Sequence, residues 1–282
     1  SIERSWSKSS TFILLSVVII SSNVISGLNG VIFSFITLIV SASASFAAVF
    51  PKILPIVQSR ESHAAPSSVI CALQFGFENV EFFICESIFG INHPEGKIHF
   101  VSSQVYEKLA YRGTSEGIIG IYKTKEFDLK NYQPKENASI IVVESVEKPG
   151  NLGAILRSCE AFGIDALIVT DSRVDFYNPN VLRSSVGCFF GMNIFSATNE
   201  ETLSFLQENR FKIYTTFMDE TAEDLYKKNF NEKSALFFGT EHSGLSDFWL
   251  NKGENILIPM SGTIDSLNLS NAVAITCYEI LR

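Results

Sequence analysis

Short apolar runs alternate with helix-like segments through the last half of the chain, and this alternation limits the fold more than any other feature. Strand, helix and strand repeated along one chain form parallel βαβ units with helices on both faces of the sheet. We therefore expect an α/β domain. The predicted strands cover residues 139–144, 166–170, 212–216, 235–239 and 255–258, and the predicted helices cover 152–162, 179–185, 200–209 and 267–281.

Three of the predicted strands lead into turns rich in glycine, serine and asparagine. The carboxyl ends of parallel strands share one edge of a sheet, and ligands of open α/β sheets bind at that edge. The three turns together therefore predict a ligand site. They read Asn151-Leu-Gly153-Ala-Ile-Leu-Arg157, then Gly239-Thr-Glu241-His-Ser-Gly244, then Pro259-Met-Ser-Gly262 followed by Ser266-Leu-Asn268-Leu-Ser270.

Each turn also has a purely structural explanation when it is taken alone. Asn151 is well suited to cap the helix that follows it, and Arg157 is then a surface cation. The second turn lacks both the G-x-G-x-x-G spacing and a Walker lysine, so a plain loop explains it. Ser266 and Asn268 are residue types that favour helix N-termini. Separate structural roles do not explain why the three turns occur together in this order.

The ordered set resembles the three signature motifs of the SpoU (TrmH) family of RNA ribose 2′-O-methyltransferases, in the SPOUT superfamily. The resemblance covers residues 137–282 and extends more weakly into residues 72–123, where family members carry a small RNA-recognition domain. It implies a SPOUT-type parallel sheet with helices on both faces, whose C-terminal segment forms a trefoil knot. It also implies a homodimer with residues of both subunits near each site.

The cofactor implied by the resemblance is S-adenosyl-L-methionine, and no metal is required. By position in the motifs, Gly239, Ile258 and Leu267 hold the adenine and ribose end of the cofactor, with Met260 nearby. Arg157 matches the arginine that orients and stabilises the ribose 2′-oxygen. The remaining polar motif positions, which complete the expected catalytic set, are Asn151, Glu241, Ser266 and Asn268.

The chain divides into four segments by amino-acid composition and pattern. Residues 1–67 are apolar and rich in serine, and residues 68–125 read as a small, partial α/β domain for RNA substrate binding. Residues 126–137 are polar and read as a linker, and residues 138–282 carry the methyltransferase motifs. The charged helical start and the Val-Glu-Gly-like turn of the family are missing upstream of residue 68.

The N-terminal segment has no charged residue between Lys8 and Lys52. Its two apolar runs, 12–25 and 31–50, suggest three alternatives: a membrane segment, a secretion signal, or an extension that does not belong to the functional domain. Any membrane association would rest on residues 11–50 alone.

Charge and cysteine usage bear on partners and compartment. The formal net charge of −8 is unusual for a nucleic-acid binder, so an RNA partner requires positive charge that is local. The five cysteines stand singly, which is typical of a reducing compartment and predicts a cytoplasmic protein. We expect an enzyme that methylates tRNA or 23S-type rRNA. The alternatives are a catalytically silent RNA-binding relative and a membrane-anchored protein that carries this domain.

Overall fold

The computed structural model describes residues 53–54, 68–90, 93–110, 116–126, 128–220, 222–264 and 266–282. The chain divides into two compact units, Ser1–Lys125 and Glu126–Arg282, and each is described by itself. The apolar runs expected at 12–25 and 31–50 lie outside the described residues. Within those residues, no helix is both long enough and apolar enough to cross a bilayer.

The described part of the first unit contains a mixed four-stranded sheet with the order β1-β4-β2-β3. β4 is antiparallel to both of its neighbours, and β3 is parallel to β2. β1 belongs to the segment 1–67 that sequence reasoning set apart, yet it pairs with Tyr122 and Lys123 of β4. The elements are β1 (Ile53–Leu54), α3 (Ser68–Gln74), β2 (Asn79–Ile84), β3 (Ile98–Phe100), α4 (Ser103–Leu109) and β4 (Ile118–Lys123).

Two buried tyrosines tie the helices of this unit to its sheet. The hydroxyl of Tyr122 donates to the carbonyl of Val69 in α3 at 2.7 Å, and burial raises the pKa of Tyr122 well above its usual range. The hydroxyl of Tyr106 in α4 donates to the carbonyl of Ile118 at 3.4 Å. Both helices are thus fixed to β4 by hydrogen bonds as well as by apolar contact.

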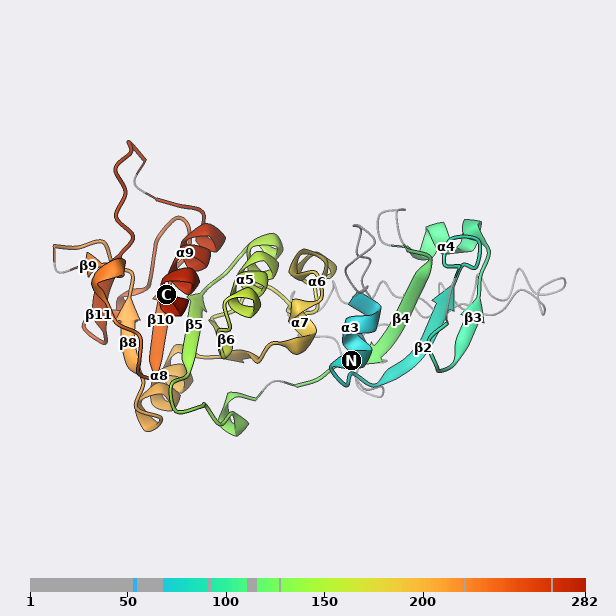
Figure 1. Cartoon of the computed structure of the whole chain (residues 1–282), viewed down its shortest axis with the longest axis horizontal. Coiled ribbons are helices and arrows are strands. Elements are labelled where there is room, and N and C mark those ends of the chain that lie inside the picture. The colour runs from blue at the N-terminus through green and yellow to red at the C-terminus, as the bar shows by residue number, and fades with distance from the viewer. Residues whose placement is uncertain are drawn as a thin grey trace, which may run out of the picture. The chain divides into compact units, whose positions relative to one another are not determined.

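The second unit is built on a seven-stranded sheet with the order β7-β6-β5-β10-β8-β11-β9, and every pairing in it is parallel (Figure 1). The expected α/β fold with a parallel sheet flanked by helices is confirmed. Its strands are β5 (Ser139–Glu144), β6 (Ala166–Thr170), β7 (Ile194–Ala197), β8 (Lys212–Thr215), β9 (Glu223–Asp224), β10 (Ser234–Phe238) and β11 (Glu254–Leu257).

The α-helices of this unit are α5 (Pro149–Ala161), α6 (Pro179–Ser185), α7 (Cys188–Gly191), α8 (Asn199–Glu208) and α9 (Leu269–Leu281). Helices α5 to α8 lie in connections between parallel strands, and α9 follows the last strand. Three short 3-10 turns are η2 (Leu129–Asn131), η3 (Leu225–Lys227) and η4 (Asp247–Trp249).

The central strand β5 is buried along its whole length, as expected for a strand covered on both faces. Ile140 and Val142 belong to the same core cluster as Phe205 of α8. Because successive strand residues point to opposite faces, Ile141 and Val143 face the other side of the sheet.

The helices α5 and α9 pack against each other, and the contact includes two buried thiols. The hydrogen bond with Cys277 of α9, together with burial, raises the pKa of Cys159 in α5. Figure 1 shows the two helices side by side. Since α5 carries the first motif and α9 begins where the third motif ends, this packing brings the two motifs together.

Candidate active site

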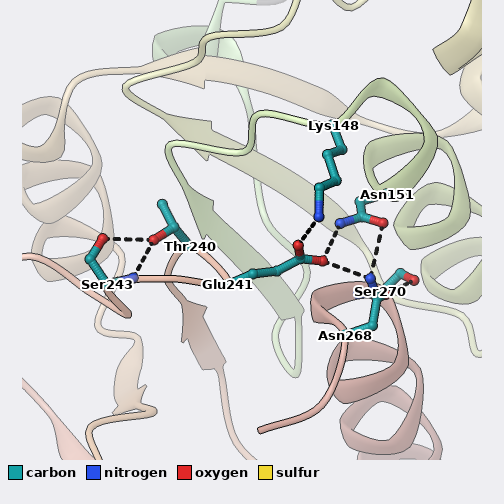
Figure 2. Close-up of polar contacts among 7 residues, drawn as sticks. All are labelled: Lys148, Asn151, Thr240, Glu241, Ser243, Asn268 and Ser270. Carbon is teal, nitrogen blue, oxygen red and sulfur yellow. Dashed lines mark hydrogen bonds and ion pairs between the residues drawn. The ribbon is translucent and has the colours of Figure 1, made fainter.

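Three loops leave the carboxyl edge of the second unit's sheet and meet at one cluster of polar side chains (Figure 2). The first loop follows β5 and carries Lys148 into the start of α5, where Asn151 lies. The second loop follows β10 and carries Glu241. The third loop follows β11 and ends at Asn268, before α9.

The start of α5 differs from the sequence prediction in one respect. The helix begins at Pro149, its N-cap is Lys148, and no side chain caps it. Proline suits the first helical position because its ring presets φ and the missing N–H has no partner there in any case. Asn151 is therefore the third helical residue rather than the cap, and its side chain is available to other loops.

The carboxylate of Glu241 is the centre of the cluster. Its Oε1 accepts hydrogen bonds from Nδ2 of Asn151 at 2.8 Å and from Nδ2 of Asn268 at 2.6 Å. Its Oε2 is paired with the ammonium group of Lys148. Nδ2 of Asn268 also lies 3.4 Å from Oδ1 of Asn151. One carboxylate thus connects all three loops.

The protonation state of Glu241 follows from these contacts. The hydrogen bond from Lys148, and after it the one from Asn151, lowers the pKa of Glu241 below its ordinary value. An ionised carboxylate only accepts hydrogen bonds, so both asparagine side chains must present their amide nitrogens to it. The ion pair therefore fixes the orientation of two neighbouring amides.

Asn268 serves a second purpose at the start of α9. Its Oδ1 accepts from the backbone N–H of Ser270 at 3.0 Å and from the Ser270 hydroxyl at 2.6 Å, which caps the helix. Asn268 therefore caps α9 with its oxygen while its amide nitrogen donates to Glu241.

The second loop is closed tightly on itself. Thr240 and Gly244 form an isolated antiparallel bridge, and the Thr240 hydroxyl lies 2.7 Å from that of Ser243. A Cβ at position 239 would lie 1.9 Å from the carbonyl carbon of Gly244. Only glycine fits at position 239, because the atoms it would displace are backbone.

The other expected site residues lie outside this hydrogen-bonded cluster. Arg157 and Ser266 are exposed, and within the described part of the chain neither side chain forms a hydrogen bond or an ion pair. Ile258 and Leu267, at the two ends of the third loop, are half-buried, and Met260 between them is 40% exposed. The structure brings together Asn151, Glu241 and Asn268 of the expected set.

Sequence reasoning missed two features: Lys148 as a member of the cluster, and the contact between Glu144 and Ser246. Lys148 stands directly before Pro149 and outside the first motif as quoted, residues 151–157. Glu144 is 4% exposed at the end of β5 and accepts hydrogen bonds from Ser246, which follows the second loop. Nothing in the spacing of these two residues, 102 positions apart, indicates the contact.

Over the residues with described positions, no group of three or more His, Cys, Asp or Glu side chains could hold a metal ion. The fold and the Glu241 cluster together define the class of protein. It is an α/β domain with a polar site built from loops at the carboxyl edge of a parallel sheet.

Residues 138–278 match the SpoU rRNA Methylase family, and the chain belongs to this family of RNA methyltransferases. An uncharacterized tRNA/rRNA methyltransferase of Borreliella burgdorferi is 38% identical over 165 residues, which cover 57% of this chain and 72% of that protein. A 23S rRNA (uridine(2479)-2′-O)-methyltransferase of Streptomyces viridochromogenes is 29% identical over 58% of this chain and 60% of its own length.

Solved structures show the same fold. A structure named as an RNA 2′-O ribose methyltransferase matches with a TM-score of 0.66 and 32% identity, over 76% of this chain and 85% of that one. The SpoU methyltransferase AviRb from Streptomyces viridochromogenes, solved in complex with AdoMet, matches with a TM-score of 0.68 over 76% of this chain and 86% of its own. At 22% identity, the second likeness concerns the fold alone.

Proposed function

We propose that this protein methylates a ribose 2′-hydroxyl in tRNA or 23S-type rRNA, with S-adenosyl-L-methionine as the methyl donor. The observation that carries the proposal is the joining of the three motif loops through Glu241, Asn151 and Asn268. The 32% identical structure named as an RNA 2′-O ribose methyltransferase supports the ribose hydroxyl as the acceptor.

The residues expected at the cofactor site fit an adenosine ligand in character. Ile258 and Leu267 offer half-buried apolar surface, and Met260 adds exposed apolar surface on the same loop. Gly239 lets the second loop fold back closely against its own backbone at the sheet edge. We propose that these four residues hold the adenine and ribose end. When bound, the cofactor supplies a methyl group activated by a sulfonium.

A ribose hydroxyl is a weak nucleophile at neutral pH, so its oxygen must be oriented and its developing charge stabilised. Arg157 can do this because a guanidinium is always protonated and offers five donors in a fixed fork. Its exposed side chain leaves those donors available to RNA. Ser266 and Asn268 would position Arg157 and the ribose or its phosphate, while Glu241 holds the loops together.

The RNA would bind through local positive charge, since the chain as a whole is acidic. Two basic side chains are already neutralised, because Lys123 pairs with Glu78 and Arg173 pairs with Glu147. Arg157 and Lys108 are exposed cations that remain for phosphate contacts. We assign the recognition of RNA outside the target nucleotide to residues 68–125.

The remaining parts of the proposal concern assembly and compartment. We propose that the loops after β10 and β11 form the trefoil knot expected of a SPOUT domain, and that two copies of the chain form a homodimer. The five free cysteines, four of them buried, suit a reducing cytoplasm in which the RNA and the methyl donor are both present.

The test is methyl transfer from radiolabelled S-adenosylmethionine to bulk RNA, with mapping of 2′-O-methyl sites in cells with and without the gene. We expect one or a few sites to disappear without the gene and the purified protein to restore them. Arg157→Ala should abolish transfer while cofactor binding persists, and Glu160→Ala on the same helix serves as the control. Full activity of Arg157→Ala would contradict the mechanism, and RNA binding without transfer would indicate the silent relative.

A further inference from the structure

We propose that Glu144 is a positioning residue of this enzyme, which holds the loop after β10 in the shape that receives the cofactor. The proposal rests on the proposed function, because it assigns that loop to the cofactor. Glu144 ends the central strand β5 and lies beneath the site rather than in it. The residue is 4% exposed, and the hydrogen bonds of its carboxylate within the described residues come from uncharged donors.

The hydrogen bonds of Glu144 connect the end of β5 to the start of α8 and to the loop after β10. Oε2 accepts from the backbone N–H of Ser246 at 2.7 Å, and Oε1 accepts from the Ser246 hydroxyl at 2.7 Å. Oε1 also accepts from Nδ2 of Asn199 at 2.8 Å. A buried carboxylate is costly unless its oxygens are satisfied, and these three donors satisfy it without a counter-ion.

Asn199 is the fixed end of this arrangement. It is the first residue of α8, directly after Thr198, whose hydroxyl forms a capping box with Glu201. Phe205 and Leu206 of the same helix lie in the core. A side chain held at a capped and packed helix start is a rigid support for the carboxylate.

Ser246 is the end that the carboxylate positions. It lies five residues after Glu241 in the sequence, between the exposed loop and Trp249. Trp249 is fully buried, and its ring centroid lies 4.2 Å from that of Phe237. The loop is therefore held at its start by the close packing at Gly239 and at its end by Glu144. Loss of the second support would free the loop that carries Glu241 without removing any side chain from the site.

Asn199 also supplies an internal control for this idea. Its Oδ1 is buried and accepts no hydrogen bond from the described residues. In a Glu144→Gln variant, the new amide can donate to Oδ1 of Asn199 after that side chain turns over, and its carbonyl can still accept from Ser246. The glutamine should therefore preserve the support. Asn199→Asp should disrupt it by placing two carboxylates together, and the double variant Glu144→Gln/Asn199→Asp should restore it.

The experiment measures KM for S-adenosylmethionine, KM for RNA, kcat, and amide hydrogen exchange of residues 240–246 in the cofactor-free full chain. For Glu144→Ala and Asn199→Asp we expect KM for the cofactor and loop exchange to rise by about tenfold or more, from loss of hydrogen bonds to a buried charge. KM for RNA should remain near the wild-type value. Both rises should be largely reversed in the double variant.

Unchanged loop exchange in Glu144→Ala, or a double variant no better than Asn199→Asp, would overturn the proposal. A role in stability alone predicts a lower melting temperature with an unchanged KM, which would also overturn it. Ser246→Ala removes only the hydroxyl bond, and it keeps the test open if Glu144→Ala does not fold. The exchange measurement needs no methyl transfer, so failure of the proposed function itself would be seen separately, as a wild-type protein that binds no cofactor.

Discussion

Asn268 has two ends with different partners: its carbonyl oxygen caps α9, and its amide nitrogen donates to Glu241. Aspartate would keep the first contact and lose the second. Serine could also cap the helix but could not reach as an amide does. Substitutions at this one position therefore separate the helix cap from the site.

We predict that Asn268→Asp lowers methyl transfer by about tenfold or more, since it sets a carboxylate against Glu241 where a donor stood. Melting temperature should change little, because asparagine and aspartate are similar caps. Asn268→Ala, which loses both contacts, should also destabilise the fold by about 1 kcal/mol. Thermal melts and transfer assays on the same preparations check both results, and a fully active Asn268→Asp would argue against the donor role.

The pair formed by Lys148 and Glu241 predicts a pH dependence. The pKa of Glu241 is lower in the folded chain than its ordinary value of 4.5. The pair therefore stabilises the fold above that value, and the contribution is lost as pH falls through the folded pKa. Because Lys148 is largely exposed, the contribution at neutral pH should stay below about 1 kcal/mol.

We accordingly expect Lys148→Gln to be slightly less stable than the wild type at neutral pH and equal to it in acid. Urea unfolding at a series of pH values measures the difference. Lys130→Gln, in η2 and away from the cluster, is the control and should show no such trend. A difference that grows toward acid would show that the sign is wrong.

At the scale of elements, two glycines set how closely the loops and helices approach. Gly239 faces the backbone of Gly244 and Leu245 in the second loop, with a would-be Cβ 1.9 Å from the nearest atom. Gly153 lets α5 approach α6, where a Cβ would lie 1.8 Å from the hydroxyl of Ser184 and 2.7 Å from the carbonyl of Val181. Gly150 in α5 and Gly262 in the third loop have no atom within 4 Å of a would-be Cβ, so they serve as comparisons.

We predict that Gly153→Ala destabilises the fold by about 1–3 kcal/mol, because the neighbouring carbonyl cannot move aside as a side chain can. Gly150→Ala, in the same helix and with nothing within 4 Å, should stabilise by about 0.5–1 kcal/mol. Denaturant unfolding of the pair compares a crowded with an open glycine in one helix. Equal effects of the two substitutions would contradict the packing argument.

For the second loop, Gly239→Ala should weaken both the fold and cofactor binding, since the displaced atoms are the backbone of Gly244 and Leu245 in the loop proposed to hold the cofactor. Gly262→Ala in the third loop, with no neighbour within 4 Å, is the matched control. Calorimetric titration with S-adenosylmethionine gives the binding constants. An unchanged binding constant for Gly239→Ala would contradict the assignment of the second loop to the cofactor site.

Elements with a clear apolar or capping pattern were predictable from sequence, and those without one were not. The strand 139–144, the strand 166–170 and the helix 179–185 have the predicted bounds. β9 consists of Glu223 and Asp224, which carry no apolar signal. Helix α5 starts three residues earlier than predicted, because Pro149 rather than Asn151 opens it. The motif order pointed to the site, but contacts between residues 90 and 117 positions apart carry no local signal.

At the scale of the whole molecule, α9 presents large apolar side chains to the outside. Ile275, Tyr278 and Leu281 are 43%, 54% and 62% exposed, and their spacing of three places them along one side of the helix. Exposed apolar side chains in such a row are typical of an interaction surface. The proposed homodimer would cover them.

We predict that Ile275→Glu together with Leu281→Glu shifts the protein from dimer to monomer and lowers transfer activity, with little loss of secondary structure. Sedimentation equilibrium measures the shift. Exposed Met218, in the loop after β8 and 76% exposed, provides the control substitution Met218→Glu. A wild-type chain that sediments as a monomer would contradict the homodimer.

The pairing of β5 with β10 joins residues 95 positions apart in the centre of the sheet, and the contact between Asn151 and Glu241 spans a similar 90 positions. Such long-range pairing makes folding slow, because much chain must be ordered before the contacts form. During synthesis, Asn151 is made 90 residues before its partner Glu241 and 117 residues before Asn268. The nascent chain therefore has no assembled Glu241 cluster until the start of α9 has been made.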